Sequence, residues 1–183
     1  MGDSMRYAKI DELEYVNGNG VGVSLYVQGC ARHCKNCFNQ ETWDFNGGKQ
    51  WDVEVKNHII ELLKRPYITR LSILGGEPLE GINVRVLYNF IKEIKQLYPN
   101  KKIWLYTGFK YEDLLVNSLN KLLDSTQTDE YRQSIIKLCD VLVDGQFEED
   151  KKDLTLKFRG SKNQRVIDIQ QSLEQDKIIL YCD

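Results

Sequence analysis

Three of the five cysteines lie within eight residues, at Cys30, Cys34 and Cys37 in the stretch Gly29 to Gln40. Thiolates at such short spacing can bind one inorganic centre, most often an iron-sulfur cluster. A structural zinc site is closed by four protein ligands, whereas a cluster held by three cysteines keeps one iron open to another ligand. The loop therefore indicates a cluster with an open position. The alternative is a zinc site with His33 as a fourth ligand, although a polar loop histidine more often faces solvent.

The composition is that of one globular domain, which we expect to span residues 1–183. A net charge of -2 disfavours nucleic acid and anionic lipid as partners. No apolar run reaches the roughly 18 residues of a membrane span, and the first residues lack a signal peptide's apolar core. An odd number of cysteines, three of them close together, favours a reducing compartment, so we expect a cytoplasmic protein.

An apolar, β-branched stretch from Val21 to Val27 predicts the strand from which the cysteine loop of residues 29–40 extends. Asp52 and Asn83 are expected to cap the first two helices, and residues 5–15 are interpreted as an irregular or edge segment. We expect further strands at 71–74, 102–106 and 141–143, late strand candidates at 165–169 and 177–181, and helices at 53–64, 84–98, 111–123 and 130–138. How the segment 146–183 packs is left open.

Strands alternating with helices predict an α/β fold with a mainly parallel sheet. In such sheets ligands bind beyond the carboxyl ends of the strands. The cysteine loop, Gly75 to Pro78, Thr107-Gly108 and Asp144-Gly145 all follow predicted strands. We therefore expect them on one rim. The cluster Asn17 to Gly22 precedes a strand and has its third glycine one residue early, so it predicts a turn and not a dinucleotide fingerprint.

The cysteine spacing, followed by Gly75-Gly76-Glu77-Pro78 after the next strand, resembles the radical S-adenosylmethionine superfamily. Several further segments are similar, in order, to the activating proteins of anaerobic ribonucleotide reductase, which belong to the glycyl-radical-enzyme activases. They are residues 16–18, 38–39, 42–43, 104–108, 141–145, 159–161 and 163–164. The resemblance runs from Val16 to Arg165, which is nearly the whole chain.

The resemblance implies a partial (β/α) barrel of the radical SAM type and a 4Fe-4S cluster on Cys30, Cys34 and Cys37. It also implies that S-adenosylmethionine binds the open iron. Reductive cleavage would give methionine and a 5'-deoxyadenosyl radical, which would take hydrogen from a backbone glycine of the reductase. The cofactors break the bonds, so no residue is assigned as a catalytic acid or base. The implied cofactor contacts are Asn36, Cys37, Phe38, Gly75, Gly76 and Glu77. Glu77 could accept a hydrogen bond from the cofactor's ammonium group.

The implied partners are the large subunit of anaerobic ribonucleotide reductase, through its glycine-bearing region, and a low-potential electron donor such as flavodoxin. One alternative is an activase of pyruvate formate-lyase or of another glycyl-radical enzyme. Alternatives of a different class are a non-catalytic iron-sulfur electron carrier and a zinc-binding module. An electron carrier would leave S-adenosylmethionine intact, and a zinc module would contain no iron.

Other chemically capable residues are weaker candidates. Asp144 at a strand end could contact the ribose or the partner, or serve the turn. Trp104 and Tyr106 alternate with apolar residues in a predicted strand and are interpreted as packing residues. Cys139 is interpreted as a small core residue, and Cys182 lies at an end expected to fray.

Overall fold

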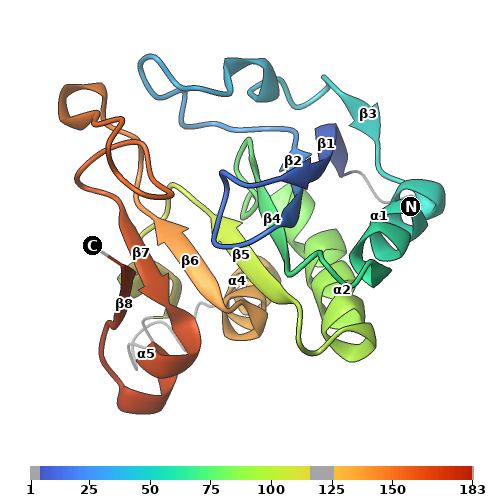
Figure 1. Cartoon of the computed structure of the whole chain (residues 1–183). Coiled ribbons are helices and arrows are strands. Elements are labelled where there is room, and N and C mark those ends of the chain that lie inside the picture. Colours follow the sequence, from blue (N-terminus) through green and yellow to red (C-terminus); the bar gives the residue numbers. More distant parts are fainter. Residues whose placement is uncertain (1–4, 116–125, 183) are drawn as a thin grey trace.

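The computed structural model describes residues 5–115 and 126–182. Eight strands in this part of the chain form one sheet, in the order β3-β1-β2-β4-β5-β6-β7-β8 (Figure 1). The strands are β1 (Arg6–Glu14), β2 (Gly22–Val27), β3 (Lys49–Gln50), β4 (Arg70–Gly75), β5 (Lys102–Tyr106), β6 (Val141–Asp144), β7 (Arg165–Asp168) and β8 (Leu180–Cys182). The α-helices are α1 (Val53–Lys64), α2 (Gly81–Leu97), α3 (Tyr111–Leu115), α4 (Gln127–Leu138) and α5 (Ile169–Gln175), and the 3-10 turns are η1 (Gln40–Thr42) and η2 (Glu149–Lys151).

The sheet is parallel only at its centre, which corrects the expectation of a mainly parallel sheet. β2, β4, β5 and β6 pair in parallel, whereas β1, β3, β7 and β8 pair antiparallel. The turn of residues 15–21 is too short for a parallel crossover, so β1 folds back on β2. β3 and β8 each have one neighbour, so the pairing of the described strands is that of an open sheet.

The two faces of the sheet are covered differently because successive strand residues point to opposite sides. Residues such as Leu25, Ile73 and Leu105 belong to the large core beneath the helices, together with Phe90 of α2 and Ile135 of α4. Figure 1 shows α2 and α4 side by side against one face of the sheet. The opposite face carries a smaller aliphatic and aromatic cluster: Trp104, Val141, Val143 and Val166, with Tyr106 and Phe158 packed against it.

A buried arginine on that second face fastens the turn between β1 and β2. Arg70 is fully buried and donates to the carboxylate of Glu14 and to the hydroxyl of Ser72, which lies 2.6 Å away. The Glu14 carboxylate also accepts from the backbone of Asn17 at 2.9 Å, and the Asn17 amide reaches Tyr26 at 3.0 Å. A buried charge needs such partners, and here they hold the turn against the sheet.

The first two helices confirm the periodic pattern but only one of the expected caps. The Asp52 carboxylate accepts from the Val55 backbone at 2.9 Å, as an N-cap does. Asn83, in contrast, lies inside α2 and is buried, and its amide donates to the carbonyls of Gln28 and Glu77. The N-cap of α2 is Glu80, whose side chain makes no capping hydrogen bond to the helix, so the prediction for Asn83 was wrong.

The remaining helix boundaries differ from the expectation in two places. The helix predicted at 111–123 is confirmed as far as Leu115, and residues 116–125 lie outside the described part of the chain. α4 begins three residues earlier than predicted, because Thr126 and Asp129 form a reciprocal capping box.

The terminal segments were the least predictable part of the fold. Residues 6–14, interpreted as an irregular or edge segment, form strand β1 next to the edge of the sheet, with only the two-residue β3 outside it; two register shifts against β2 interrupt its alternation. At the other end, residues 146–182 join the sheet through β7 and β8. α5 begins at Ile169, where Asp168 caps it, so the strand predicted at 165–169 ends one residue early. No helix of the described residues is long and apolar enough to cross a membrane.

Candidate functional site

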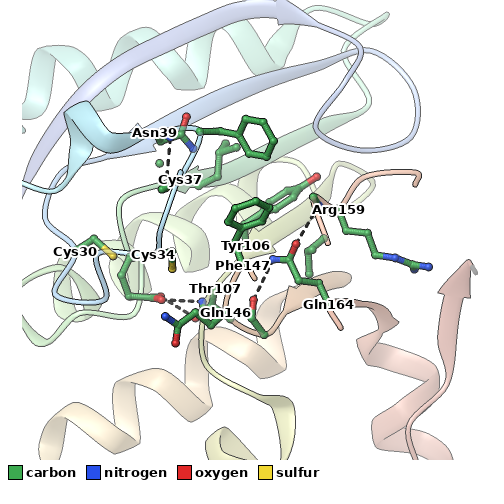
Figure 2. A pocket seen from close by; sticks show the side chains of 18 of the residues that line it. Cys30, Cys34, Cys37, Asn39, Tyr106, Thr107, Gln146, Phe147, Arg159 and Gln164 are labelled. Atoms are coloured by element: carbon green, nitrogen blue, oxygen red, sulfur yellow. Dashed lines mark hydrogen bonds between the residues drawn. The ribbon is translucent and has the colours of Figure 1, made fainter. Parts of the chain in front are cut away.

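The cysteine loop and the loops after β4, β5 and β6 meet around one cavity of about 400 Å³. Cys30, Cys34 and Cys37 line it, and all three are free thiols. Figure 2 shows them along one side of the cavity, with Tyr106, Gln164 and Arg159 across from them. The loops predicted to share one rim do share it, because the parallel strands β2, β4, β5 and β6 end at the same edge of the sheet.

The cysteine loop is compact because two of its residues adopt a left-handed backbone. His33 has a φ of 46° and Asn36 a φ of 54°, which turns the chain twice between the cysteines. The base of the loop is closed by hydrogen bonds from Gly29 to Thr42 at 2.8 Å and from Cys30 to Trp43 at 3.2 Å. The backbone itself therefore places the three thiols on one short segment.

The Gly-Gly-Glu-Pro loop lies directly against the cysteine loop. The Glu77 backbone donates to the Gly29 carbonyl at 2.8 Å, and Gly76 donates to Val27 at 2.9 Å. A Cβ at Gly76 would lie 2.5 Å from the Gly29 carbonyl oxygen, so only glycine permits this approach. The glycine is needed here for contact between two loops of the same chain, whatever else it contacts.

The carboxylate of Glu77 is buried, with 1% of the residue exposed, and each of its oxygens accepts two hydrogen bonds. Oε1 accepts from the backbone of Leu79 at 3.0 Å and from the hydroxyl of Thr107 at 2.7 Å. Oε2 accepts from the backbone of Gly108 at 2.8 Å and from the guanidinium of Arg32 at 3.2 Å. Burial raises the pKa of this carboxyl, although the hydrogen bonds that it accepts act to lower the pKa. Glu77 thus ties three loops of the rim together.

Because a carboxylate has about four acceptor positions, the oxygens of Glu77 are already occupied. An ammonium group arriving at Glu77 would have to replace one of these donors. Arg32 is the one with the most freedom, since its side chain is 24% exposed and rests on the ring of Phe109. The sequence did not single out Arg32, because the signal for its role is a carboxylate 45 residues away.

The far wall of the cavity is the loop of residues 145–164, which the sequence left open. Gln164 fixes this loop: its amide oxygen accepts from the backbones of Gly160 at 2.9 Å and Ser161 at 3.1 Å, and its amide nitrogen donates to Gly145 at 3.0 Å. Figure 2 shows Gln164 at this wall. Arg159 and Gln164 lie in two of the segments on which the family resemblance rests, and the structure places both in the wall of the cavity.

Two residues interpreted as packing residues behave differently from one another. Trp104 is buried in the smaller core cluster, as expected. Tyr106 also packs there, but it reaches the cavity, and its hydroxyl is buried without a hydrogen-bond partner. Burial raises the pKa of this phenol, so it remains a neutral donor.

Several other candidates have structural partners. Asp144 is buried and accepts from Arg165 and from the backbone of Tyr111 at 2.8 Å, which serves the turn. His33 stacks on Trp43 with 4.6 Å between the ring centroids. Cys139 is a fully buried core residue, as predicted, and Cys182 lies in β8. Asn36 is exposed and is not among the residues that line the cavity.

The three thiols of the cysteine loop are candidate ligands of a metal centre. Within the described residues, no group of three or more His, Cys, Asp or Glu side chains is placed to hold one metal ion. Each thiolate of a 4Fe-4S cluster binds a different iron, so the three sulfurs need not meet at one point. Burial raises the pKa of the Cys30 thiol, so its deprotonation would depend on a bound cationic centre. The residues fit a cluster held by three thiolates.

Comparison with known proteins supports an iron-sulfur cofactor. Residues 16–167 match a family model described as a 4Fe-4S single cluster domain. The chain is 35% identical over 162 residues to the anaerobic ribonucleoside-triphosphate reductase-activating protein of Pasteurella multocida, covering 87% of this chain and 95% of that protein. Its identity to the proteins of the same name is 34% in Escherichia coli K12 and 33% in phage T4, with 88% of this chain covered in each case and 97% and 93% of those proteins.

Proposed function

We infer the function of this chain from the family to which it belongs, the anaerobic ribonucleoside-triphosphate reductase-activating proteins: it activates an anaerobic ribonucleotide reductase. We propose that it does so as a radical S-adenosylmethionine enzyme, an oxidoreductase. The observation that carries this proposal is the meeting of three free cysteines and the Gly-Gly-Glu-Pro loop at one cavity.

In this proposal Cys30, Cys34 and Cys37 hold a 4Fe-4S cluster with one open iron. When bound and reduced, the cluster would pass one electron to S-adenosylmethionine, cleaving it to methionine and a 5'-deoxyadenosyl radical that takes a hydrogen atom from a reductase glycine. The chain's own residues bind and orient these groups. Cys30 lies at the buried base of the loop, and Cys34 and Cys37 are partly exposed beside the cavity.

The cofactor contacts remain the proposed set. Gly75 and Gly76 offer backbone groups at the cavity wall, where the absence of side chains allows close approach. Phe38 and Cys37 line the same cavity and are proposed to contact the cofactor, and Asn36 is retained as a neighbour on the same turn. Glu77 holds the Gly-Gly-Glu-Pro loop against the cysteine loop, and it would receive the ammonium group only in exchange for Arg32.

The wider setting is also proposed. The parallel strands β2, β4, β5 and β6, with helices on one face, are compatible with the partial (β/α) barrel of the radical SAM type. A low-potential electron donor such as flavodoxin would reduce the cluster, and the activation would take place in the cytoplasm. The large subunit of the reductase would present its glycine-bearing region to the cavity.

The test is S-adenosylmethionine cleavage by protein reconstituted with iron and sulfide under anaerobic conditions and reduced with dithionite. We expect 5'-deoxyadenosine from the wild-type protein and none from Cys34→Ala. Cys182→Ala is the matched control, because Cys182 is a free cysteine of β8 that does not line the cavity. Intact S-adenosylmethionine after incubation with fully loaded wild-type protein would indicate an electron carrier and overturn the proposal.

A further inference from the structure

Three large apolar side chains at the mouth of the cavity are exposed to solvent. Val16 is 75% exposed, Phe38 57% and Leu154 80%, and all three line the same cavity. They come from three distant segments: the β1–β2 turn, the cysteine loop and the loop between β6 and β7. Single exposed apolar residues are ordinary, but a group gathered around one opening is typical of a binding surface.

This surface is already formed in the free protein, because contacts with the rest of the chain hold each of the three segments in place. The ring of Phe38 packs on that of Phe147, with 5.3 Å between centroids. A Cβ at Gly160 would lie 3.1 Å from both rings, so the backbone of the loop presses on the aromatic pair. Gln164 holds that backbone, and Glu14 holds the turn that carries Val16. A preformed surface loses little conformational entropy when a partner binds.

A cation without a partner lies beside these apolar side chains. Arg159 lines the cavity, makes no ion pair or hydrogen bond with the rest of the described chain, and its Nε is buried without an acceptor. In Figure 2 its guanidinium points away from the cysteines. The other arginine of the cavity, Arg32, is paired with Glu77. A buried donor left without an acceptor is costly, so a bound partner that supplies an acceptor would be favoured at Arg159.

We propose that Val16, Phe38, Leu154 and Arg159 form the docking surface for an extended segment of the reductase that carries apolar side chains and one carboxylate, with Arg159 pairing with that carboxylate. This proposal rests on the function proposed above, in which a backbone glycine of the partner must reach the cavity. An extended chain fits this requirement, because its main chain can pass the rim while its side chains contact the apolar residues. The guanidinium fork favours a carboxylate as the paired group.

The test is the affinity of the reconstituted protein for the large subunit of anaerobic ribonucleotide reductase from the same organism, measured anaerobically by biolayer interferometry. Leu154→Ser and Arg159→Met remove one apolar and one charged contact. We expect each to weaken binding by about tenfold, as loss of an interface anchor does. The weakening of wild-type binding by added salt should also be smaller in Arg159→Met.

Matched controls lie elsewhere on the surface. Leu97→Ser changes an exposed leucine at the end of α2, and Lys157→Met removes an exposed cation from the same loop as Arg159; neither residue lines the cavity. Both should bind like the wild type. Equal iron content and melting temperature across the set exclude misfolding as the cause.

Three outcomes would overturn the docking proposal: wild-type affinity in both Leu154→Ser and Arg159→Met, equal weakening in the control variants, or a change in self-association in place of reductase binding. Failure of the proposed function gives a separate result, since loaded wild-type protein would then bind no reductase and leave S-adenosylmethionine intact.

Discussion

Replacing Glu77 by glutamine tests whether this carboxylate holds the rim of the site together. The substitution keeps the shape of the side chain but turns one acceptor oxygen into a donor. If the new amide nitrogen faces Leu79 and Thr107, the Thr107 hydroxyl can rotate to accept, but the Leu79 backbone N–H loses its partner. A buried N–H without an acceptor costs about 1–3 kcal/mol. The hydrogen bond from Arg32 to a neutral amide oxygen is weaker, by about 1 kcal/mol, than the same bond to a carboxylate. Removing a buried charge offsets part of this loss.

We therefore expect Glu77→Gln to lower the free energy of unfolding by about 2 kcal/mol. The assay is urea denaturation of the iron-free protein, so that cofactor loading does not enter the measurement. Glu80→Gln is the control, because within the described residues the Glu80 carboxylate accepts one hydrogen bond, from the backbone N–H of Ala31, which glutamine can keep. Equal stability of the two variants would refute the assignment of Glu77 as the residue that joins the loops.

Three further predictions follow from particular contacts. Gly76→Ala should lower the free energy of unfolding by about 1–3 kcal/mol in urea denaturation, because the new Cβ would meet the carbonyl oxygen of Gly29. Gly81→Ala is the control and should be neutral or slightly stabilising, because the nearest atoms to its new Cβ are 3.7 Å away. The hydrogen bond from Arg165 lowers the pKa of Glu112 to about 2, from its ordinary value of 4.5. The contribution of this carboxylate to the free energy of unfolding is therefore complete above pH 4.5 and is lost as the pH falls toward 2. Glu112→Gln should flatten the pH dependence of stability in that window by less than about 1 kcal/mol, since the side chain is 49% exposed. Cys139 should resist iodoacetamide in the native protein and react in urea, as peptide mass spectrometry can show, because burial raises the pKa of its thiol.

Each of these predictions has a contrary result. Equal stability of Gly76→Ala and Gly81→Ala would mean that the two loops do not touch as described. If the free energy of unfolding of Glu112→Gln depends on pH as that of the wild type does, Glu112 does not pair with Arg165 as described. Alkylation of native Cys139 at the rate of Cys182 would contradict its place in the core.

The sequence predicted the parts of the fold that depend on local pattern. The apolar run at residues 71–74 and the helical period from Leu87 to Ile94 identify elements that the structure contains. Because such strands end at one edge of a parallel sheet, the meeting of the cysteine loop with Gly76 was also predictable.

What the sequence could not show depends on contacts between distant residues. Arg70 comes just before the strand predicted at 71–74 and resembles a surface charge in the sequence, but in the structure it begins β4 and pairs with Glu14, 56 residues away. Asn83 has the residue type of a cap, but its buried contact with Gln28 places it inside α2. Gln164 belongs to a segment without strong periodicity, and its role becomes visible only when the loop folds back on Gly145. Tertiary contacts decide each of these cases.

The most direct test of the central claim is electron paramagnetic resonance of the anaerobic ribonucleotide reductase after incubation with the reconstituted, reduced protein and S-adenosylmethionine. We expect a carbon-centred radical on a glycine of the reductase; it should require S-adenosylmethionine and be absent with Cys34→Ala. A reductase without this radical, in the presence of protein that carries a full cluster and cleaves S-adenosylmethionine, would contradict it.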